Sequence, residues 1–241
     1  MEESKTQIKR ETTPFTESGE CIDEIEFVFD DERSLYVSQN FLKYVSPVFK
    51  AMFEHDFKEK ENKSVTMTGK KYEDVLEFLL CLHPNMQKSV TKDNVLSVVH
   101  IAEEYQAELM ITRCQSVMSD WLKSELALAQ TPTSLEDRSR RARTCLRVMS
   151  EANSLQYETL VKEACTVIAY FGHVIFTGTV LLPPSYSKFA IRQRKILTNV
   201  DNPVSDCKKL FDNLSIELKY ELIQKRLKLC DTLEMYEANE Y

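Results

Sequence analysis

The sequence predicts an α+β domain followed by a mostly α-helical region. Two short β-rich runs, residues 25–29 and 34–37, flank a polar turn and are typical of a hairpin. After residue 41 most apolar residues recur at helical spacing, with one further β-like run at 64–67. A polar stretch at 131–143 separates this domain from a second set of helical patterns.

The segment before the hairpin, residues 1–21, is polar and charged and has few apolar anchors. We expect it to be a disordered N-terminal tail, because so little apolar surface cannot offset the entropy of ordering the chain. It has no apolar run of the kind that a secretory signal needs. We therefore place the first domain at residues 22–123.

One helix of this domain has a clear predicted start at Ser46-Pro47. The Ser46 hydroxyl can cap free N–H groups of a first turn, and Pro47 suits the first helical position because its missing N–H costs nothing there. The segment ends in Phe57-Lys58-Glu59, an aromatic and acidic end that the buried face of the helix does not need. That buried face consists of Val48, Phe49, Met52 and Phe53.

Further helices of the first domain follow from the same apolar spacing. One of them stops at His83-Pro84, because the residue before a proline disfavours helical backbone. Another is expected to start at Thr91, whose hydroxyl can act as a cap. The apolar sets lie within residues 41–45, 72–82, 95–102 and 109–121.

The second part of the chain begins after a change in composition. Residues 124–143 predict a linker or a solvated helix start, because they combine Pro132 and Ser134 with four arginines. Residues 144–241 predict a helical C-terminal region. Its helical patterns lie at 145–149, at 160–164 and from 215 to 236, and the four arginines are Arg138, Arg140, Arg141 and Arg143.

An irregular apolar insert at about 166–200 interrupts that helical region. Residues 164–187 contain no Asp, Glu, Lys or Arg. A stretch of about 20 apolar residues can span a bilayer, but Gly172, His173 and Gly178 lower the apolarity that insertion requires. We expect a buried hairpin or an irregular loop rather than a membrane span, and translated non-coding sequence is a further alternative.

The composition favours protein partners. A content of 43% apolar and 29% charged residues is ordinary for a soluble globular protein. The net charge of -7 and the pI near 5.3 disfavour nucleic acid and anionic membrane surfaces, since binding to either needs clustered positive charge. Seven cysteines lie far apart, and most fall on apolar helical faces, so we expect reduced core thiols in a cytoplasmic or nuclear protein.

Neither catalysis nor a cofactor is expected. The sequence has no CxxC and no paired Cys/His spacing, which disfavours a metal site. It also has no Ser/His/Asp or Cys/His constellation, and its four glycines form no phosphate-binding loop. We therefore expect a protein that is not an enzyme.

Residues 23–122 resemble the BTB/POZ domain of MATH-BTB and related animal proteins. This resemblance implies a small sheet beside a helical cluster, and a homodimer. The later segments 155–165 and 214–219 are similar to the helical, BACK-like tail of nematode BTB proteins. The matching motifs are Leu35-Tyr36-Val37, Phe41-Leu42, Ser46 to Phe53, Val65-Thr66-Met67, Phe78-Leu79-Leu80, His83-Pro84, Thr91 to Val95, Ile101 to Gln106 and Arg113-Cys114.

The resemblance also implies a function. Many such proteins are non-catalytic adaptors that bridge a substrate to cullin-3 RING ubiquitin ligases. At the matching position, Phe57 and Glu59 correspond to an apolar-x-Glu motif that contacts the cullin, with His55, Asp56 and Lys58 as rim residues. Aromatic anchors dominate interface energetics, which supports a partner contact for Phe57.

For dimerisation, the resemblance implies a surface built from the first strand and the first helix. The same residues could equally lie in the hydrophobic core of the domain. No MATH, Kelch-repeat or zinc-finger module is present, so recognition of an unknown substrate protein is expected to fall to residues 142–241. The implied dimer residues are Ile25, Phe27, Phe41, Leu42 and Val45.

Two other classes of function remain open. The first is a non-ligase scaffold or a transcription-linked homo-oligomerisation protein, in which Arg138 to Arg143 serve as a nuclear-import patch rather than as a solvated helix face. The second is the tetramerising module of potassium channels. That module fits less well, because its pattern lacks the Ser46-Pro47 start and the Met52-Phe53 step.

Overall fold

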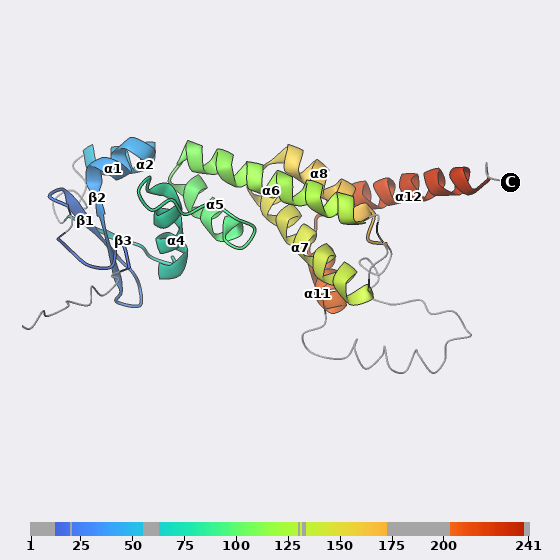
Figure 1. Cartoon of the computed structure of the whole chain (residues 1–241), viewed down its shortest axis with the longest axis horizontal. Coiled ribbons are helices and arrows are strands. Elements are labelled where there is room, and N and C mark those ends of the chain that lie inside the picture. Colours follow the sequence, from blue (N-terminus) through green and yellow to red (C-terminus); the bar gives the residue numbers. More distant parts are fainter. Residues whose placement is uncertain are drawn as a thin grey trace, which may run out of the picture. The chain divides into compact units, whose positions relative to one another are not determined.

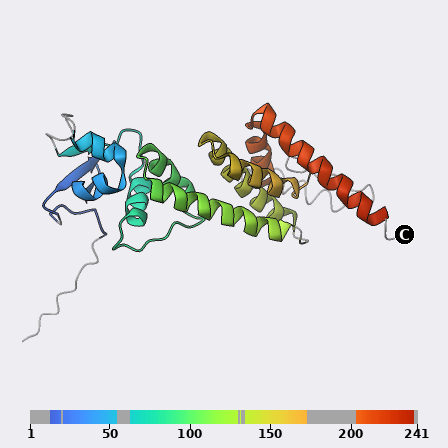
Figure 2. The same cartoon turned by 90° about the horizontal axis from the view of Figure 1, so that it is seen from above.

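The structure has two compact units, Met1–Cys114 and Gln115–Tyr241, which we call unit 1 and unit 2. Figures 1 and 2 show their helices and strands from two directions. Helix α6 (Glu108–Ala129) begins in unit 1 and ends in unit 2. The computed structural model describes residues 13–19, 21–54, 63–129, 131, 134–172 and 203–238.

Unit 1 contains a three-stranded sheet with the order β2-β1-β3. Strand β1 (Glu24–Val28) pairs antiparallel with β2 (Ser34–Ser38) and parallel with β3 (Ser64–Thr66). Alternate side chains point to one face of the sheet, and on that face they are buried. The predicted hairpin and third strand are thereby confirmed. The buried sheet residues are Ile25, Phe27, Leu35, Val37 and Val65.

Helices complete unit 1 at nearly the positions that the apolar spacing predicts. The one shifted start is that of α5, which begins at Val95 and not at Thr91. The Thr91 hydroxyl instead accepts the N–H of Asp93 at 3.3 Å, in the turn before the helix. Besides α5 (Val95–Glu104), the helices are α1 (Gln39–Val45), α2 (Pro47–Glu54) and α4 (Tyr72–Leu82), followed by the first residues of α6.

The start of α2 is held from two directions. The Ser46 hydroxyl accepts the N–H of Phe49 at 3.0 Å, which confirms the predicted cap, and donates to the Tyr105 carbonyl at 2.5 Å. The Phe49 ring stacks on the Tyr105 ring with 4.1 Å between centroids, and the Phe27 and Phe53 rings stack on Phe49 as well. One buried hydroxyl and a group of stacked rings therefore fix α2 against the end of α5 and against the sheet.

Packing in unit 1 starts before the hairpin. The Phe15 side chain is 6% exposed, and its carbonyl accepts the N–H of Tyr36 at 2.8 Å. Its ring also meets the His83 ring edge-on at 5.6 Å. The expectation of a disordered tail through residue 21 differs from the structure here. The composition of the whole segment is polar, but one buried aromatic ring is enough to anchor the residues around it. Residues 1–12 of that tail lie outside the described residues.

All regular secondary structure in the described residues of unit 2 is helical. Helix α7 (Leu135–Ser154) packs against α8 (Glu158–Ala169) and α11 (Pro203–Asp212), and α8 also packs against α12 (Ile216–Ala238). Its core is formed mainly by aliphatic side chains and by cysteines. Fully or nearly fully buried residues include Cys145, Leu146, Met149, Ala164, Ile168, Cys207 and Leu222.

Two expected boundaries in unit 2 differ from the structure. Residues 124–129 belong to α6 and residues 134–143 to α7, so the alternative of a helix start replaces most of the predicted linker. Residues 166–169 complete α8 and Phe171 is buried, so the insert cannot begin at 166, while residues 173–200 lie outside the described residues. Helix α11 was not predicted.

The corner between α5 and α6 is closed by two backbone hydrogen bonds. The N–H of Ala107 donates to the Ala102 carbonyl at 2.8 Å, and the N–H of Gln106 donates to the Glu103 carbonyl at 3.1 Å. Gln106 has a φ of 50°, in the left-handed region. This is the Schellman arrangement that ends many helices.

The corner between α7 and α8 repeats the same arrangement in unit 2. The N–H of Tyr157 donates to the Ala152 carbonyl at 2.8 Å, and the N–H of Gln156 donates to the Asn153 carbonyl at 3.2 Å. Gln156 has a φ of 60°. Both units therefore turn between two helices on a left-handed glutamine.

Candidate protein-interaction surface

Helix α1 is tied to the residue that precedes β1. The Asp23 carboxylate accepts the Ser38 hydroxyl and the N–H of Asn40, both at 2.8 Å. Ser38 in turn accepts the N–H of Phe41 at 3.2 Å and so caps α1. Partial burial acts to raise the pKa of Asp23, but the hydrogen bonds from Asn40 and Ser38 outweigh it and hold that pKa below its usual value. The orientation of α1 is thus fixed at its first turn.

This fixed orientation presents an aromatic residue to solvent. Leu42 faces the core and is fully buried, whereas Tyr44 is 91% exposed. Phe41 and Val45 are half-buried, and Ile22, which precedes Asp23, is fully exposed. Exposed apolar groups that gather along one helix are typical of surfaces that bind another protein. We call Ile22, Phe41, Tyr44 and Val45 the α1 surface.

The structure divides the five implied dimer residues. Ile25 and Phe27 are each 1% exposed and Leu42 is 0% exposed, so these three side chains belong to the core of unit 1. The physical reason is the alternation of β1, which turns its odd-numbered residues toward the helices. Phe41 and Val45 remain at the surface.

Sequence reasoning missed the two most exposed members of the α1 surface. Tyr44 lies three residues after Phe41, a spacing that places both side chains on one side of a helix and was a usable signal. Ile22 carries no such signal, because it lies in a turn.

All five residues of the implied cullin contact lie outside the described residues. Helix α2 ends at Glu54, immediately before them. Within α2, Phe49 and Phe53 are buried and stacked on each other, so the core positions of this helix are already filled. The residues without a described position are His55, Asp56, Phe57, Lys58 and Glu59.

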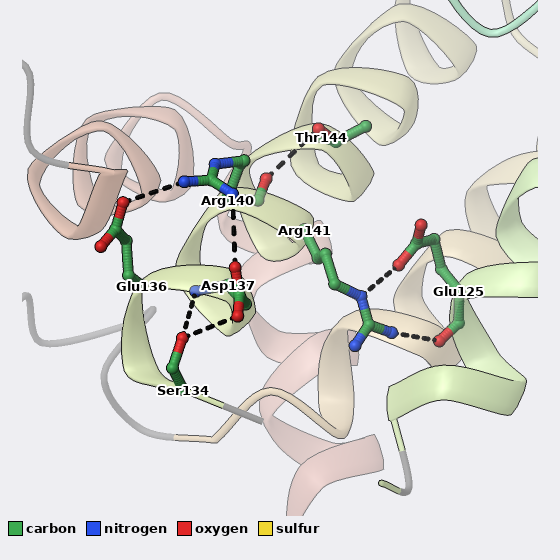
Figure 3. A network of polar contacts seen from close by, with 7 residues as sticks. All are labelled: Glu125, Ser134, Glu136, Asp137, Arg140, Arg141 and Thr144. Carbon is green, nitrogen blue, oxygen red and sulfur yellow. Dashed lines mark hydrogen bonds and ion pairs between the residues drawn. The ribbon is translucent and has the colours of Figure 1, made fainter. Parts of the chain in front are cut away.

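The four arginines of α7 make contacts within unit 2, and Figure 3 shows those of Arg140 and Arg141. Arg141 lies against the end of α6: its Nε donates to the Glu125 carboxylate at 2.6 Å, and its other nitrogens donate to the Glu125 and Leu128 carbonyls. Arg140 pairs with Glu136 and Asp137 on its own helix. Arg141 thus links α7 to α6, a structural role that was not among the two interpretations of the basic run, a solvated helix face or a nuclear-import patch.

The other two arginines reach different helices of unit 2. Arg138 donates to the Phe171 carbonyl at 3.3 Å, just after α8, and Arg143 pairs with Asp206 of α11 at 3.1 Å. Cations near the carboxyl end of a helix interact favourably with its dipole. Helix α7 therefore binds α6, α8 and α11 through its arginines.

A shallow pocket of about 170 Å³ lies at the corner of α7 and α8. Its lining mixes charges of both signs with amides, so it has no clear preference for a ligand. Among the described residues no group of three or more His, Cys, Asp and Glu is placed to hold a metal ion. The pocket is lined by Asn153, Gln156, Glu158, Val161, Lys162 and Glu221.

Five of the seven cysteines are buried, as the sequence analysis expected of most. Burial raises the pKa of Cys81 to about 11 and that of Cys114 to about 12, so these thiols stay protonated and unreactive. Cys21 is exposed and Cys230 is half-buried. No helix in the described part of the chain has the length and apolarity needed to cross a membrane.

Comparison with known proteins identifies the domain in unit 1. The family model of the BTB/POZ domain matches residues 15–121. These residues form a BTB/POZ domain. The match covers the sheet, the helices of unit 1 and much of α6, and it begins at Phe15, the first buried side chain among the described residues. The resemblance and the α+β fold expected from the sequence are confirmed.

A relative also carries this domain. BTB and MATH domain-containing protein 38 of Caenorhabditis elegans is 27% identical to this chain over 136 residues, which are 55% of this chain. The match spans 34% of that relative's length. BTB domains are protein-protein interaction modules, and the α1 surface belongs to this one.

Proposed function

We propose that this chain is a homodimeric substrate adaptor of a cullin-3 RING ubiquitin ligase. In this proposal the BTB domain dimerises through the α1 surface and binds cullin-3 through residues 55–59, and it acts without catalysis in the cytoplasm or the nucleus. The observation that carries the proposal is a BTB domain whose α1 helix, fixed by Asp23 and Ser38, exposes Tyr44. The substrate protein is unknown.

The dimer part of the proposal rests on the cost of an exposed aromatic ring. Tyr44 has a large apolar area that burial against a second copy would remove from water, and tyrosine is enriched among residues that dominate binding energy. Phe41 and Val45 border it on the same helix. A two-fold dimer uses one patch on both copies, so a single surface of this kind is sufficient.

The dimer is tested by replacing Tyr44. We expect Tyr44→Glu to weaken the dimer by about tenfold or more in Kd, because it places a charge in an apolar contact. Light scattering over a concentration series measures the change. Lys50→Glu, at an exposed position of α2, is the matched control and should leave the dimer unchanged. A wild-type chain that stays monomeric at all concentrations would contradict the proposal.

The cullin part of the proposal rests on the sequence after α2. Phe49 and Phe53 fill the core positions of that helix, which ends at Glu54, and Phe57 follows in the sequence. The resemblance to adaptor BTB domains assigns that contact to a cullin pocket and assigns a polar contact to Glu59. The acidic character of the chain is consistent with a protein partner rather than a nucleic acid.

Binding to the N-terminal half of cullin-3 tests this contact. We expect Phe57→Ala and Glu59→Ala each to cost about 1 kcal/mol or more of binding free energy, measured by calorimetry. Lys50→Ala, on the exposed side of α2, should bind like the wild type. If the wild-type chain does not bind cullin-3 but still dimerises, the non-ligase scaffold replaces the adaptor.

A further inference from the structure

Helix α12 exposes a line of apolar residues on the side that faces away from its own unit. Ile216 is 79% exposed, and Tyr220, Ile223 and Leu227 are also among the most exposed large apolar residues of the described chain. Cys230 is half-buried and follows at the same spacing. We call these five residues the α12 stripe.

The opposite side of α12 is fixed to unit 2. Leu218 and Leu222 are buried, and α12 packs against α8. Lys225 donates to the Lys162 carbonyl at 3.0 Å, and Arg226 donates to the Ala169 carbonyl at 2.9 Å. Rotation of the helix to hide its stripe would break these contacts, so the described residues of one copy leave the stripe exposed.

The spacing of the stripe is that of a coiled coil. Its members recur at intervals of four, three, four and three residues from Ile216 to Cys230. An apolar repeat of about 3.5 residues is the pattern that pairs one helix with another along a shared seam. The same spacing also occurs on helices that cover a globular core, but there the stripe is buried, whereas this one is exposed.

The charges beside the stripe indicate which helix pairs with it. Glu217 and Asp231 flank one edge, and Lys219 and Arg226 flank the other. In a parallel pair, the basic edge of each helix lies against the acidic edge of its neighbour. An antiparallel pair would place acid beside acid and base beside base, which is unfavourable.

We propose that α12 pairs in parallel with α12 of a second copy of this chain, along the α12 stripe. Its acidic and basic edges complement each other when the second helix has the same sequence and the same direction. This contact is separate from the α1 surface and does not depend on the cullin proposal. It gives the chain two self-association surfaces, one in each unit.

Cys230 provides a direct test. In a parallel, in-register pair, equivalent residues of the stripe face each other, so the two Cys230 thiols lie side by side. A short bismaleimide, which adds one thiol to each of its two double bonds, should then link two full-length chains. The experiment uses a Cys21→Ser background, because Cys21 is exposed and the other five cysteines are buried. A covalent dimer is the expected product.

Two substitutions at neighbouring positions distinguish a charge placed in the stripe from a charge placed elsewhere on α12. Leu227→Glu, in the stripe, should lower the yield of linked dimer by about tenfold, which corresponds to the loss of one apolar anchor. Lys228→Glu, at the adjacent exposed position outside the stripe, should leave the yield unchanged. Circular dichroism checks that both variants stay folded.

A second background separates this contact from the α1 surface. In the Tyr44→Glu variant the Cys230 link should persist, whatever happens to dimerisation through unit 1. Absence of the link in the Cys21→Ser chain would overturn the proposal. Equal yields for Leu227→Glu and Lys228→Glu would overturn it as well, since the link would then report random collision. Retention of the BTB dimer in either case would leave the proposed function intact.

Discussion

The corner between α5 and α6 and the corner between α7 and α8 share one backbone arrangement but differ in what covers them. Both turn on a left-handed glutamine with the same pair of hydrogen bonds. In the first corner Tyr105 and Ala107 are buried, whereas Leu155 and Tyr157 at the matching positions of the second are half-buried. Local sequence therefore sets the turn, and tertiary packing decides the burial.

The cover over the first corner comes from α2. The Ser46 hydroxyl donates to the Tyr105 carbonyl, and the Phe49 ring stacks on the Tyr105 ring. The second corner instead borders the shallow pocket that Gln156 helps to line. The comparison shows that the same Schellman corner forms whether or not other side chains bury it. We expect the burial to determine how much unfolding free energy a substitution at the corner removes.

The largest expected effect is at Tyr105. Tyr105→Ala should lower the free energy of unfolding by about 3 to 5 kcal/mol, because it removes a buried ring that stacks on Phe49. The matching change in the second corner, Leu155→Ala, should cost about 1 kcal/mol, since this side chain is only half-buried. Urea denaturation followed by circular dichroism measures both. Equal costs would contradict the difference in cover.

A smaller effect is expected when the side chains of the two corners are exchanged. Ala107→Tyr should destabilise the chain by about 1 to 3 kcal/mol, because the site in unit 1 is fully packed. Tyr157→Ala should change stability by less than about 1 kcal/mol, since Tyr157 is half-buried. The same denaturation experiment applies. A tolerated Ala107→Tyr would mean that the first corner has room that its burial does not indicate.

The two glutamines should respond alike, whatever covers them. Gln106→Gly and Gln156→Gly should each stabilise the chain by about 0.5 kcal/mol, because glycine adopts a positive φ without steric cost but loses more entropy on folding. Thermal unfolding would show a small rise in Tm for both. Opposite signs would show that packing, and not the backbone alone, selects the residue at this position.

The smallest effect at neutral pH is expected for Tyr105→Phe, which removes only a hydroxyl that contacts the Met67 sulfur. Burial, and next to it the charge of Glu104, raises the pKa of Tyr105 to about 12. A raised folded-state pKa stabilises the fold fully below the unfolded pKa of 10, and this stability is lost as the pH rises toward 12.

Alkaline titration checks that sign. Wild-type stability should fall more steeply than that of Tyr105→Phe between pH 10 and about 12, because only the wild type must ionise a buried phenol. Equal slopes for the wild type and Tyr105→Phe would contradict the burial of the ring.

The parts of the fold that depend on local signals could be predicted from the sequence. The Ser46-Pro47 start and the alternation in the hairpin are such signals, and both appear where expected. The repeated corner also has a signal in the sequence. Ala102, Gln106 and Glu108 recur at the same spacing as Ala152, Gln156 and Glu158. It was overlooked because no apolar pattern marks it.

The parts that depend on distant contacts could not be predicted. Only the packed structure shows that Leu42 faces inward while Tyr44 faces solvent. The role of Arg141 depends on carbonyl groups at the end of α6, which no spacing within α7 encodes. Helix α11 contains few apolar residues, and Cys207 and Phe211 become a recognisable face only against α7. The cullin contact at Phe57 stays a prediction.

The early burial of Phe15 matters to anyone who trims this chain. A fragment cut at residue 22, the boundary that composition alone suggests, would lose the ring beside His83 and would leave the Tyr36 N–H without its acceptor. Such a fragment would expose an unsatisfied donor and a vacant apolar site on the outer strand of a hairpin, a combination that promotes aggregation. Shortened versions should therefore begin no later than Thr13.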